Sequence, residues 1–276
     1  MMAGGGAAIP VNYVRCQNNT RCVCMTGYIS SNAPPYTLSA WANIDAAQPS
    51  LSEGRMLCMT GVKGSSSTVQ GLEVGYVIDN GIPKIRCGFI QSGTTSIVDV
   101  PYDGVGTWHM ITATVTTAQC NTYIDGSLIG QTGVTNYAGV TSARLGLCSL
   151  RWQRNGVISG GPIGCYANLA YWGRVLSQSE ILALAQGGIA FAPVDAEHKY
   201  DMQIVDGKIT DTGSAGGWDF TTITDFTGGT FAPGTAMGGG GKLTCARRSH
   251  RRSLRPSVRF WRISRRWACM RREVAA

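Results

Sequence analysis

One stretch near the middle of the chain, residues 107–126, constrains the fold more than any other. It reads TWHMITATVTTAQCNTYIDG: an alternating run from Trp108 to Val115, a polar break, and a second run that ends at Ile124. Alternation is the period of a β-strand, whose successive side chains point to opposite faces of a sheet. The closing Asp125-Gly126 favours a tight hairpin turn, because glycine takes a positive φ without steric cost. Strands that lead into hairpins predict an antiparallel β-sandwich.

Short strand patterns separated by turns occupy most of residues 11–235, and we expect about a dozen strands. Two short strands are predicted within residues 11–30, and one to three within residues 189–235. The other predicted strands cover 36–44, 55–62, 71–78, 82–91, 94–100, 127–131, 143–150 and 163–172. Residues 151–161 predict a polar loop between the last two of these.

The strand over residues 163–172 has apolar side chains in both alternating sets. Simple alternation predicts that one set faces one way, namely Ile163, Cys165, Ala167, Leu169 and Tyr171. It predicts that the other set faces the opposite way, namely Tyr166, Asn168, Ala170 and Trp172. We expect Leu169 to lie in the sandwich core.

A single short helix is predicted directly after this strand. Ser177 and Glu180 have the spacing of a capping box, in which each side chain binds a backbone N–H group at the start of a helix. Ile181, Leu184 and Ala185 supply an apolar face, and Gly187-Gly188 predicts the end of the helix.

Charge is divided unevenly along the chain. Residues 1–241 contain 12 Lys/Arg and 15 Asp/Glu, a net charge of −3, whereas residues 242–276 contain 12 Lys/Arg and one Glu, a net charge of +11. Gly238–Gly241 separates these parts. We therefore predict an N-terminal arm with the first strands over 1–35, a sandwich over 36–237, and a linker with a basic tail over 238–276.

The ten cysteines are scattered, and Cys120, Cys148 and Cys165 stand at apolar strand positions. The N-terminus lacks the basic and apolar regions of a secretory signal. We therefore expect these three thiols to be reduced and buried. Cys22 and Cys24 have no second pair at zinc spacing, which argues against a zinc site. No run approaches the length of a membrane span, so no membrane partner is expected.

Residues 36–188 resemble the concanavalin A-like lectin/glucanase superfamily, specifically its laminin G-like domains. YTLSAWANI resembles an early strand of the family, TWHM…TYIDG its central hairpin, and IGCYANLAYWGRVLSQSEILALAQGG its closing strand and helix. Residues 198–221 resemble a later stretch of the family. The resemblance implies an all-β, laminin G-like jelly-roll β-sandwich with one short helix. It does not identify a function, because this fold serves binding, adhesion, catalysis and structure.

Catalysis is not expected. A retaining glycosidase needs two carboxyl groups about 5 Å apart, yet Glu53, Glu73 and Glu180 are isolated in the sequence. No nucleophile motif accompanies His109, His198 or His250.

Two candidate binding sites follow from the loops. A glycan site would use the aromatic and amide groups of the loop after residue 150, namely Arg151, Trp152, Gln153, Arg154 and Asn155. No cofactor is required, but the resemblance allows calcium at a rim of the sandwich. Its candidate ligands lie in turns, where Asp and Asn are also common for structural reasons: Asp79, Asn80, Asp103 and Asp125.

The basic tail interleaves arginines with tryptophans, which suits a polyanion or an acidic protein face. The candidate docking residues are Arg251, Arg252, Arg255, Trp261, Arg265, Arg266 and Trp267. An extension read in another frame or through a stop codon would have the same composition without any selected role.

Two classes of function remain. The first is a structural protein of a virus particle, a bacteriophage capsid decoration or appendage component. It would be located in the virion after assembly in the host cytoplasm, with other shell proteins, further copies of itself and surface glycans as partners. The alternative is a cellular glycan-binding or adhesion module. An enzyme ranks below both.

Overall fold

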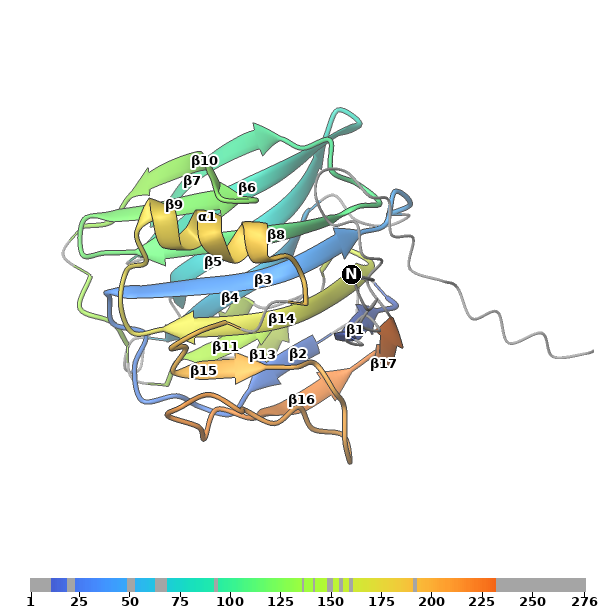
Figure 1. Ribbon diagram of the computed structural model, residues 1–276. Helices are drawn as coiled ribbons and strands as arrows, with labels where there is room; N and C mark the ends of the chain where they lie inside the picture. Colours follow the sequence, from blue (N-terminus) through green and yellow to red (C-terminus); the bar gives the residue numbers. More distant parts are fainter. Residues whose placement is uncertain are drawn as a thin grey trace, which may run out of the picture. The chain divides into compact units, whose positions relative to one another are not determined.

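The computed structural model describes residues 11–18, 23–48, 53–62, 69–91, 94–135, 137–140, 142–147, 151–153, 156–158, 161–190 and 193–231. They belong to one compact unit, Met1–Cys245. Within these ranges the chain forms 17 strands and one helix (Figure 1). The predicted all-β fold with one short helix is confirmed.

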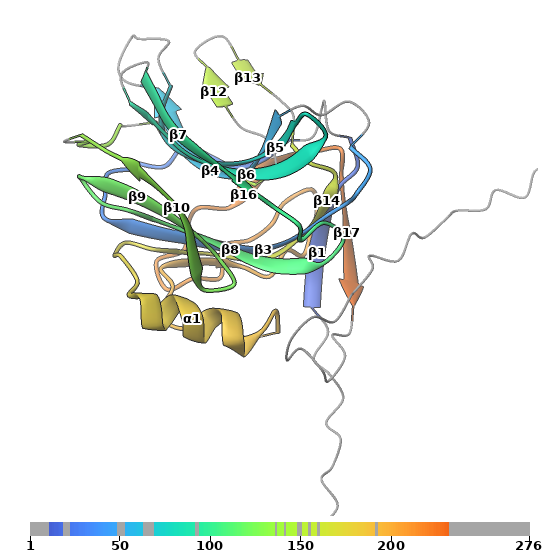
Figure 2. The same cartoon turned by 90° about the horizontal axis from the view of Figure 1, so that it is seen from above.

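Two antiparallel sheets pack face to face (Figure 2). The first sheet has the order β10 (Ser127–Gly133), β9 (Gln119–Ile124), β8 (Trp108–Val115), β3 (Tyr36–Ile44), β14 (Gly164–Trp172), β1 (Val11–Cys16) and β17 (Phe226–Phe231), with β15 (His198–Tyr200) paired to β14. The second has the order β16 (Phe220–Thr224), β2 (Val23–Thr26), β11 (Arg144–Leu147), β4 (Glu53–Val62), β5 (Val69–Asp79), β6 (Ile82–Gln91) and β7 (Thr94–Pro101).

The main core lies between the two sheets. Alternate side chains of the strands meet there, among them Leu38 and Ile111 from the first sheet and Leu72 and Phe89 from the second. Each such side chain contributes about 1.5–3 kcal/mol on burial. The two-residue period of the sequence thus decides which face of each strand enters the core.

Helix α1 (Gln178–Gly187) covers the other face of the first sheet (Figure 2). Its buried Ile181 belongs to a second apolar cluster with Trp41, Trp108 and Trp172. All nine residues of β3 are buried, because one face meets the main core and the other lies beneath this cluster. Strands buried on both faces lose the contrast between apolar and polar positions.

The alternation predicted for β14 fails in its second half. The pairing of β14 with β3 shifts between Ala167 and Ala170, and Asn168 has a positive φ of 47°. This β-bulge changes which side chains share a face. Tyr166, Leu169 and Tyr171 face the main core, whereas Cys165, Ala167, Ala170 and Trp172 face the helix.

The polar loop predicted for residues 151–161 is also wrong. The chain forms a two-stranded hairpin there, β12 (Arg151–Gln153) and β13 (Gly156–Ile158). The two predicted N-terminal strands are confirmed as β1 and β2, one in each sheet. A hairpin this short escapes prediction, because three-residue strands show hardly one period of alternation.

The predicted capping box of α1 is confirmed. Glu180 N donates to Ser177 Oγ at 3.3 Å, and Ser177 N donates to Glu180 Oε2 at 2.7 Å. Gly188 ends the helix with a φ of 76°, which a residue with a side chain rarely adopts.

The prediction for the three cysteines has mixed outcomes. Cys120 is free and buried, as expected. The prediction for Cys165 is wrong, because this residue is disulfide-bonded. It lies on the helix side of β14, not in the main core. Cys148 lies outside the described residues.

Candidate functional site

The outer face of the second sheet carries polar groups in rows that cross several strands. Leu72, Val74 and Tyr76 of β5 point into the main core, so Glu73 and Gly75 point outward. One row follows the pairing Cys58, Glu73, Gly88 and Ile97, and the next follows Arg55, Gly75, Arg86 and Asp99. The face therefore brings two arginines and two carboxylates together.

The first ion pair joins β4 to β5. Arg55 Nε and Nη2 both donate to Glu73 Oε2, each at 3.2 Å. The two side chains are 16% and 8% exposed, so this pair is more enclosed than a usual surface pair. Cys58 lies beside it, and burial raises the pKa of the Cys58 thiol, with the Glu73 carboxylate adding to the shift. The thiol therefore stays protonated near neutral pH.

The second ion pair joins β6 to β7. Arg86 Nε donates to Asp99 Oδ1 and Arg86 Nη2 to Asp99 Oδ2, both at 2.7 Å. This two-point geometry is among the strong arrangements of charged groups. The hydrogen bonds from Arg86 lower the pKa of Asp99 below its usual value. Asp99 thus remains a carboxylate over the ordinary pH range.

Gly75 lies between the two ion pairs and leaves no room for a side chain there. A Cβ atom at Gly75 would lie 3.1 Å from the Gly54 carbonyl oxygen and 3.4 Å from Arg86 Cβ. Gly75 stands between Arg55 and Arg86 in the same row. The two arginines therefore flank a position that has no side chain of its own and is itself buried.

The predicted glycan-binding segment lies next to this face. β12, which contains Arg151, Trp152 and Gln153, lies against β4 and β5, and Figure 2 shows the hairpin on the side of the second sheet away from α1. Arg154 and Asn155 lie outside the described residues. The hairpin thus brings the predicted loop close to the strands that hold Arg55 and Glu73.

Three of the predicted calcium ligands, Asp79, Asn80 and Asp125, form hydrogen bonds or ion pairs with other side chains or with the backbone. Asp79 Oδ2 accepts from Lys84 Nζ at 2.6 Å, and Asn80 Nδ2 donates to Asp79 Oδ1 at 3.1 Å. Asp125 Oδ2 lies 2.6 Å from His109 Nδ1, and its Oδ1 accepts from Met110 N at 2.8 Å. These contacts give the acidic groups structural roles in turns.

Asp103 and Asp125 both lie near Tyr102. Burial raises the pKa of the Tyr102 phenol, and the two carboxylates add to the shift. Within the described ranges, no group of three or more His, Cys, Asp or Glu side chains is placed to hold a metal ion. Calcium binding at Asp79, Asn80, Asp103 and Asp125 stays a prediction from the sequence.

The two described histidines are held by carboxylates. His109 pairs with Asp125, as above, and packs edge to face on Tyr102 at 5.7 Å between ring centroids. His198 Nδ1 lies 2.6 Å from Asp211 Oδ2, and its ring stacks on Trp218 at 3.6 Å. His198 is buried, which makes it part of the packing. His250 and the predicted tail residues from Arg251 to Trp267 lie outside the described ranges.

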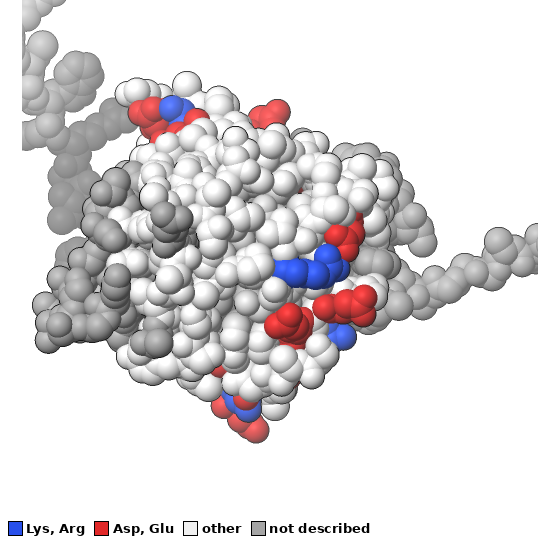
Figure 3. Space-filling model, turned by 90° about the vertical axis from the view of Figure 1, so that its left-hand side faces the viewer, with Lys and Arg blue, Asp and Glu red and all other residues white. Residues whose placement is uncertain are grey.

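Charged side chains are sparse over the face shown in Figure 3, where they form small groups of mixed sign. This distribution agrees with the low charge of residues 1–241 in the sequence. No described helix has the length and hydropathy of a membrane-spanning one.

Sequence reasoning missed Arg55, Glu73, Arg86 and Asp99 as a group. They are spread over four strands, and only the register of the sheet brings them together. A usable signal was present, because each stands at a polar position between apolar residues of its strand. The alternation of polar and apolar residues does not reveal the order of the strands in the sheet, which is what brings the four residues together.

A family model described as the concanavalin A-like lectin/glucanases superfamily matches residues 19–182. The chain belongs to this superfamily. The match covers both strands of the central hairpin and the first half of α1, and it confirms the laminin G-like resemblance. No curated protein matches the chain.

Several solved structures resemble the fold of the chain at low sequence identity. A heptameric SAP-like pentraxin from Limulus polyphemus has a TM-score of 0.51 and 10% identity, covering 66% of this chain and 85% of that one. A candidate carbohydrate-binding protein from Bacteroides ovatus has a TM-score of 0.50 and 13% identity, covering 82% and 61%. A Trypanosoma rangeli sialidase has a TM-score of 0.43 and 14% identity, covering 64% and 32%. At these identities the likeness concerns the fold alone.

Proposed function

We propose that this chain is a non-enzymatic, lectin-like module that binds a glycan on the outer face of its second sheet. The observation that carries the proposal is the pair of charge-balanced groups, Arg55 with Glu73 and Arg86 with Asp99, on adjacent rows of that face. The Bacteroides ovatus protein of similar fold is described as a candidate for carbohydrate binding, which agrees with this choice.

The chemistry of the face suits a ligand with many hydroxyl groups. Arginines supply only hydrogen-bond donors and carboxylates only acceptors, and a sugar hydroxyl can satisfy both. Arg55 and Arg86 are each paired with a carboxylate, so these two pairs attract an ionic ligand only weakly. A ligand would contact the outer edges of the Arg55 and Arg86 side chains, since Gly75 between them is buried.

Trp152 on the neighbouring hairpin is the proposed aromatic platform. The apolar face of a sugar ring packs on an indole, while its hydroxyls meet the polar side chains. Arg151, Gln153, Arg154 and Asn155 are proposed to add hydrogen bonds around that platform.

Hydrolysis of the bound glycan is not part of the proposal. Glu73 and Asp99 lie two strands apart with a two-residue offset, which places their Cα atoms roughly 12 Å apart. A retaining pair requires a carboxyl separation of about 5 Å and an inverting pair about 6.5–9.5 Å, whereas Glu73 and Asp99 are each held by a different arginine. A general acid also needs a raised pKa, whereas Arg86 lowers that of Asp99.

A glycan array followed by calorimetric titration of the full chain tests the proposal. We expect neutral oligosaccharides to bind, and Arg86→Gln to weaken binding about fivefold or more, since a charged hydrogen bond contributes about 1.5 kcal/mol. Trp152→Ala should weaken binding about fivefold or more because it removes the proposed packing surface for a sugar ring. Lys208→Gln, on another part of the surface, is the control and should bind as the native chain does. Equal affinity in all variants would reject this face as the site. Reducing sugar released during the titration would instead indicate an enzyme.

A virion role is the second candidate, and the observation that favours it is the charge of +11 over residues 242–276. In this proposal the chain is a bacteriophage capsid decoration or appendage protein in many copies. The basic tail residues, with Trp261 and Trp267, would dock on an acidic face of another shell protein. Glycan binding by the sandwich is compatible with this role.

Electron microscopy of the native assembly distinguishes the virion from a free module. Particles that carry the chain in regular positions are the expected result. A chain found only as free monomer would overturn the virion role without affecting glycan binding.

A further inference from the structure

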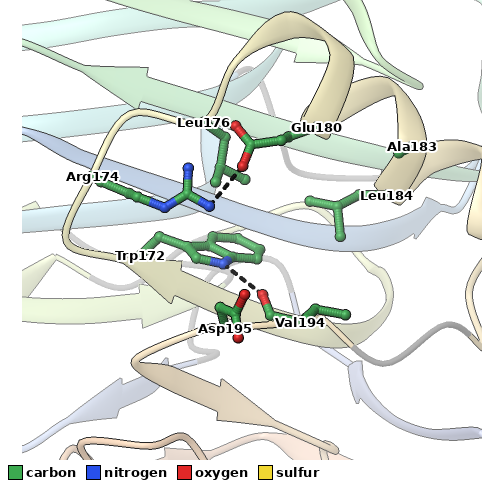
Figure 4. Close-up of a pocket in the computed structure, with 8 residues that line it drawn as sticks. All are labelled: Trp172, Arg174, Leu176, Glu180, Ala183, Leu184, Val194 and Asp195. Atoms are coloured by element: carbon green, nitrogen blue, oxygen red, sulfur yellow. Dashed lines mark hydrogen bonds and ion pairs between the residues drawn. The ribbon is translucent and has the colours of Figure 1, made fainter.

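A small pocket opens between α1 and the segment that follows it (Figure 4). Figure 2 shows α1 on the side of the sandwich opposite the proposed glycan face. Its volume is about 180 Å³, which suits one large side chain. Eight residues line it: Trp172, Arg174, Leu176, Glu180, Ala183, Leu184, Val194 and Asp195. Nothing in the fold or in the proposed function uses this pocket.

The floor of the pocket is apolar and structurally fixed. The Trp172 indole is 2% exposed, and its Nε1 donates to the Val194 carbonyl oxygen at 3.1 Å. Leu176 is buried and Leu184 is half-buried, both beside the indole (Figure 4). Since the indole N–H is already engaged, this floor offers packing surface and no hydrogen bond.

Three charged residues line the rim of the pocket, and two of them, Arg174 and Glu180, form an ion pair. Arg174 Nη2 donates to Glu180 Oε1 at 2.7 Å, and Glu180 Oε2 accepts from Ser177 N at 2.7 Å. Asp195 forms no hydrogen bond or ion pair with the described residues, although its charge helps to raise the pKa of Arg174, after the larger effect of Glu180. Arg174, Glu180 and Asp195 together have a net charge of −1, and that charge resides on Asp195.

We propose that this pocket binds one arginine side chain of a partner protein. The methylene stem of the arginine would pack on Trp172 and Leu184, and its guanidinium would pair with the Asp195 carboxylate. Long basic side chains commonly combine an apolar stem with a charged head in this way. The planar guanidinium also matches the two oxygens of a carboxylate.

The surroundings of the pocket fit a protein partner better than a free small molecule. Val194, one of the lining residues, is 60% exposed. Apolar side chains around a pocket exclude water from a buried anchor when a second surface covers them. A partner segment with an arginine between apolar residues would therefore cover this rim.

The probe is n-pentylguanidinium, which has the stem and the head of the arginine side chain. Saturation-transfer NMR on the full chain should detect its binding at low millimolar concentration, as expected for so small a ligand. Pentylurea keeps the shape without the charge, and methylguanidinium keeps the charge without the stem. Both should bind at least fivefold more weakly.

Two variants test whether the probe binds in this pocket. Asp195→Asn should weaken binding at least fivefold and abolish its salt dependence; asparagine also tolerates the positive φ of 54° found here. Ala183→Phe, at an exposed position of the lining, should block entry without disturbing the core. Asp206→Asn is the matched control, because Asp206 is exposed with a similar φ of 49° and lies outside the lining.

Three outcomes overturn the proposal. They are no saturation transfer at about 20 mM probe, equal binding by pentylurea, or unchanged affinity in the Asp195→Asn and Ala183→Phe variants. Loss of probe binding in the Asp206→Asn control would also count against it, since the effect would then not be local.

Discussion

Asp211 has a fully buried carboxylate that organises the segment after β15. Its Oδ2 lies 2.6 Å from His198 Nδ1 and accepts from Trp218 N at 3.2 Å. Its Oδ1 accepts from Gly213 N at 2.9 Å. A buried donor that loses its acceptor still bears the cost of its removal from water. The contacts made by His198, Gly213 and Trp218 therefore all depend on the Asp211 carboxylate.

Replacement of Asp211 should therefore be costly. Asp211→Asn presents an NH₂ group to the backbone donors, and we expect a loss of about 2–4 kcal/mol in the free energy of unfolding, measured with urea. Asp206→Asn, at an exposed turn, should change it by less than about 0.5 kcal/mol. A loss below about 1 kcal/mol at Asp211 would mean that water replaces its contacts.

Leu169 and Trp172 lie on opposite faces of β14, and both are buried. We expect Leu169→Ala to cost about 2–5 kcal/mol and Trp172→Ala about 3–5 kcal/mol. Urea unfolding of the two single variants measures both values. A small effect at either residue would show that the corresponding apolar cluster is not closely packed.

At the scale of elements, helix α1 depends on charge at its first turn. Hydrogen bonds from Arg174 and Ser177 lower the pKa of Glu180 from its ordinary 4.5 to about 2. A carboxyl group with a lowered pKa in the folded state stabilises that state above its unfolded pKa. This contribution is lost as the pH falls through the folded value.

Glu180→Gln should accordingly lower the melting temperature at pH 7, and its difference from the native chain should shrink between pH 4.5 and pH 2. Thermal unfolding across this range gives the measurement. Asp103→Asn, which removes an exposed carboxylate that caps no helix, is the control for general charge effects. A constant difference at all pH values would point to packing rather than charge.

Elements with clear periods were predictable from the sequence, and the exceptions have physical reasons. β3 and the hairpin of β8 and β9 match their predicted ranges closely, because their patterns are long and their turn residues specific. The bulge at Asn168 was not predictable, since both faces of β14 are apolar and alternation there cannot reveal a change of face. The Arg55 and Arg86 site required strand order, which depends on packing between distant segments.

At the scale of the whole molecule, the last described strand is β17, which ends at Phe231. If the sandwich is complete before the linker, deletion of residues 238–276 should leave the melting temperature of the body nearly unchanged. The truncated chain should instead lose association with particles, and the loss should be greatest at low salt, where a charge of +11 acts most strongly. Calorimetry and a salt series of particle binding measure the two effects. A collapse of the melting transition would show that the boundary lies elsewhere.

The position of β1 has a consequence for the living cell. Val14 pairs with Tyr166 of β14, and Val11 pairs with Phe231 of β17. A ribosome adds roughly 5–20 residues per second, so the first strand leaves it roughly 10–45 s before its last partner exists. Both edges of β1 are open until β14 is made, and the edge that pairs with β17 stays open for the whole interval. β1 can therefore pair with a wrong strand until β17 has been made, and slower translation lengthens the time during which this can happen.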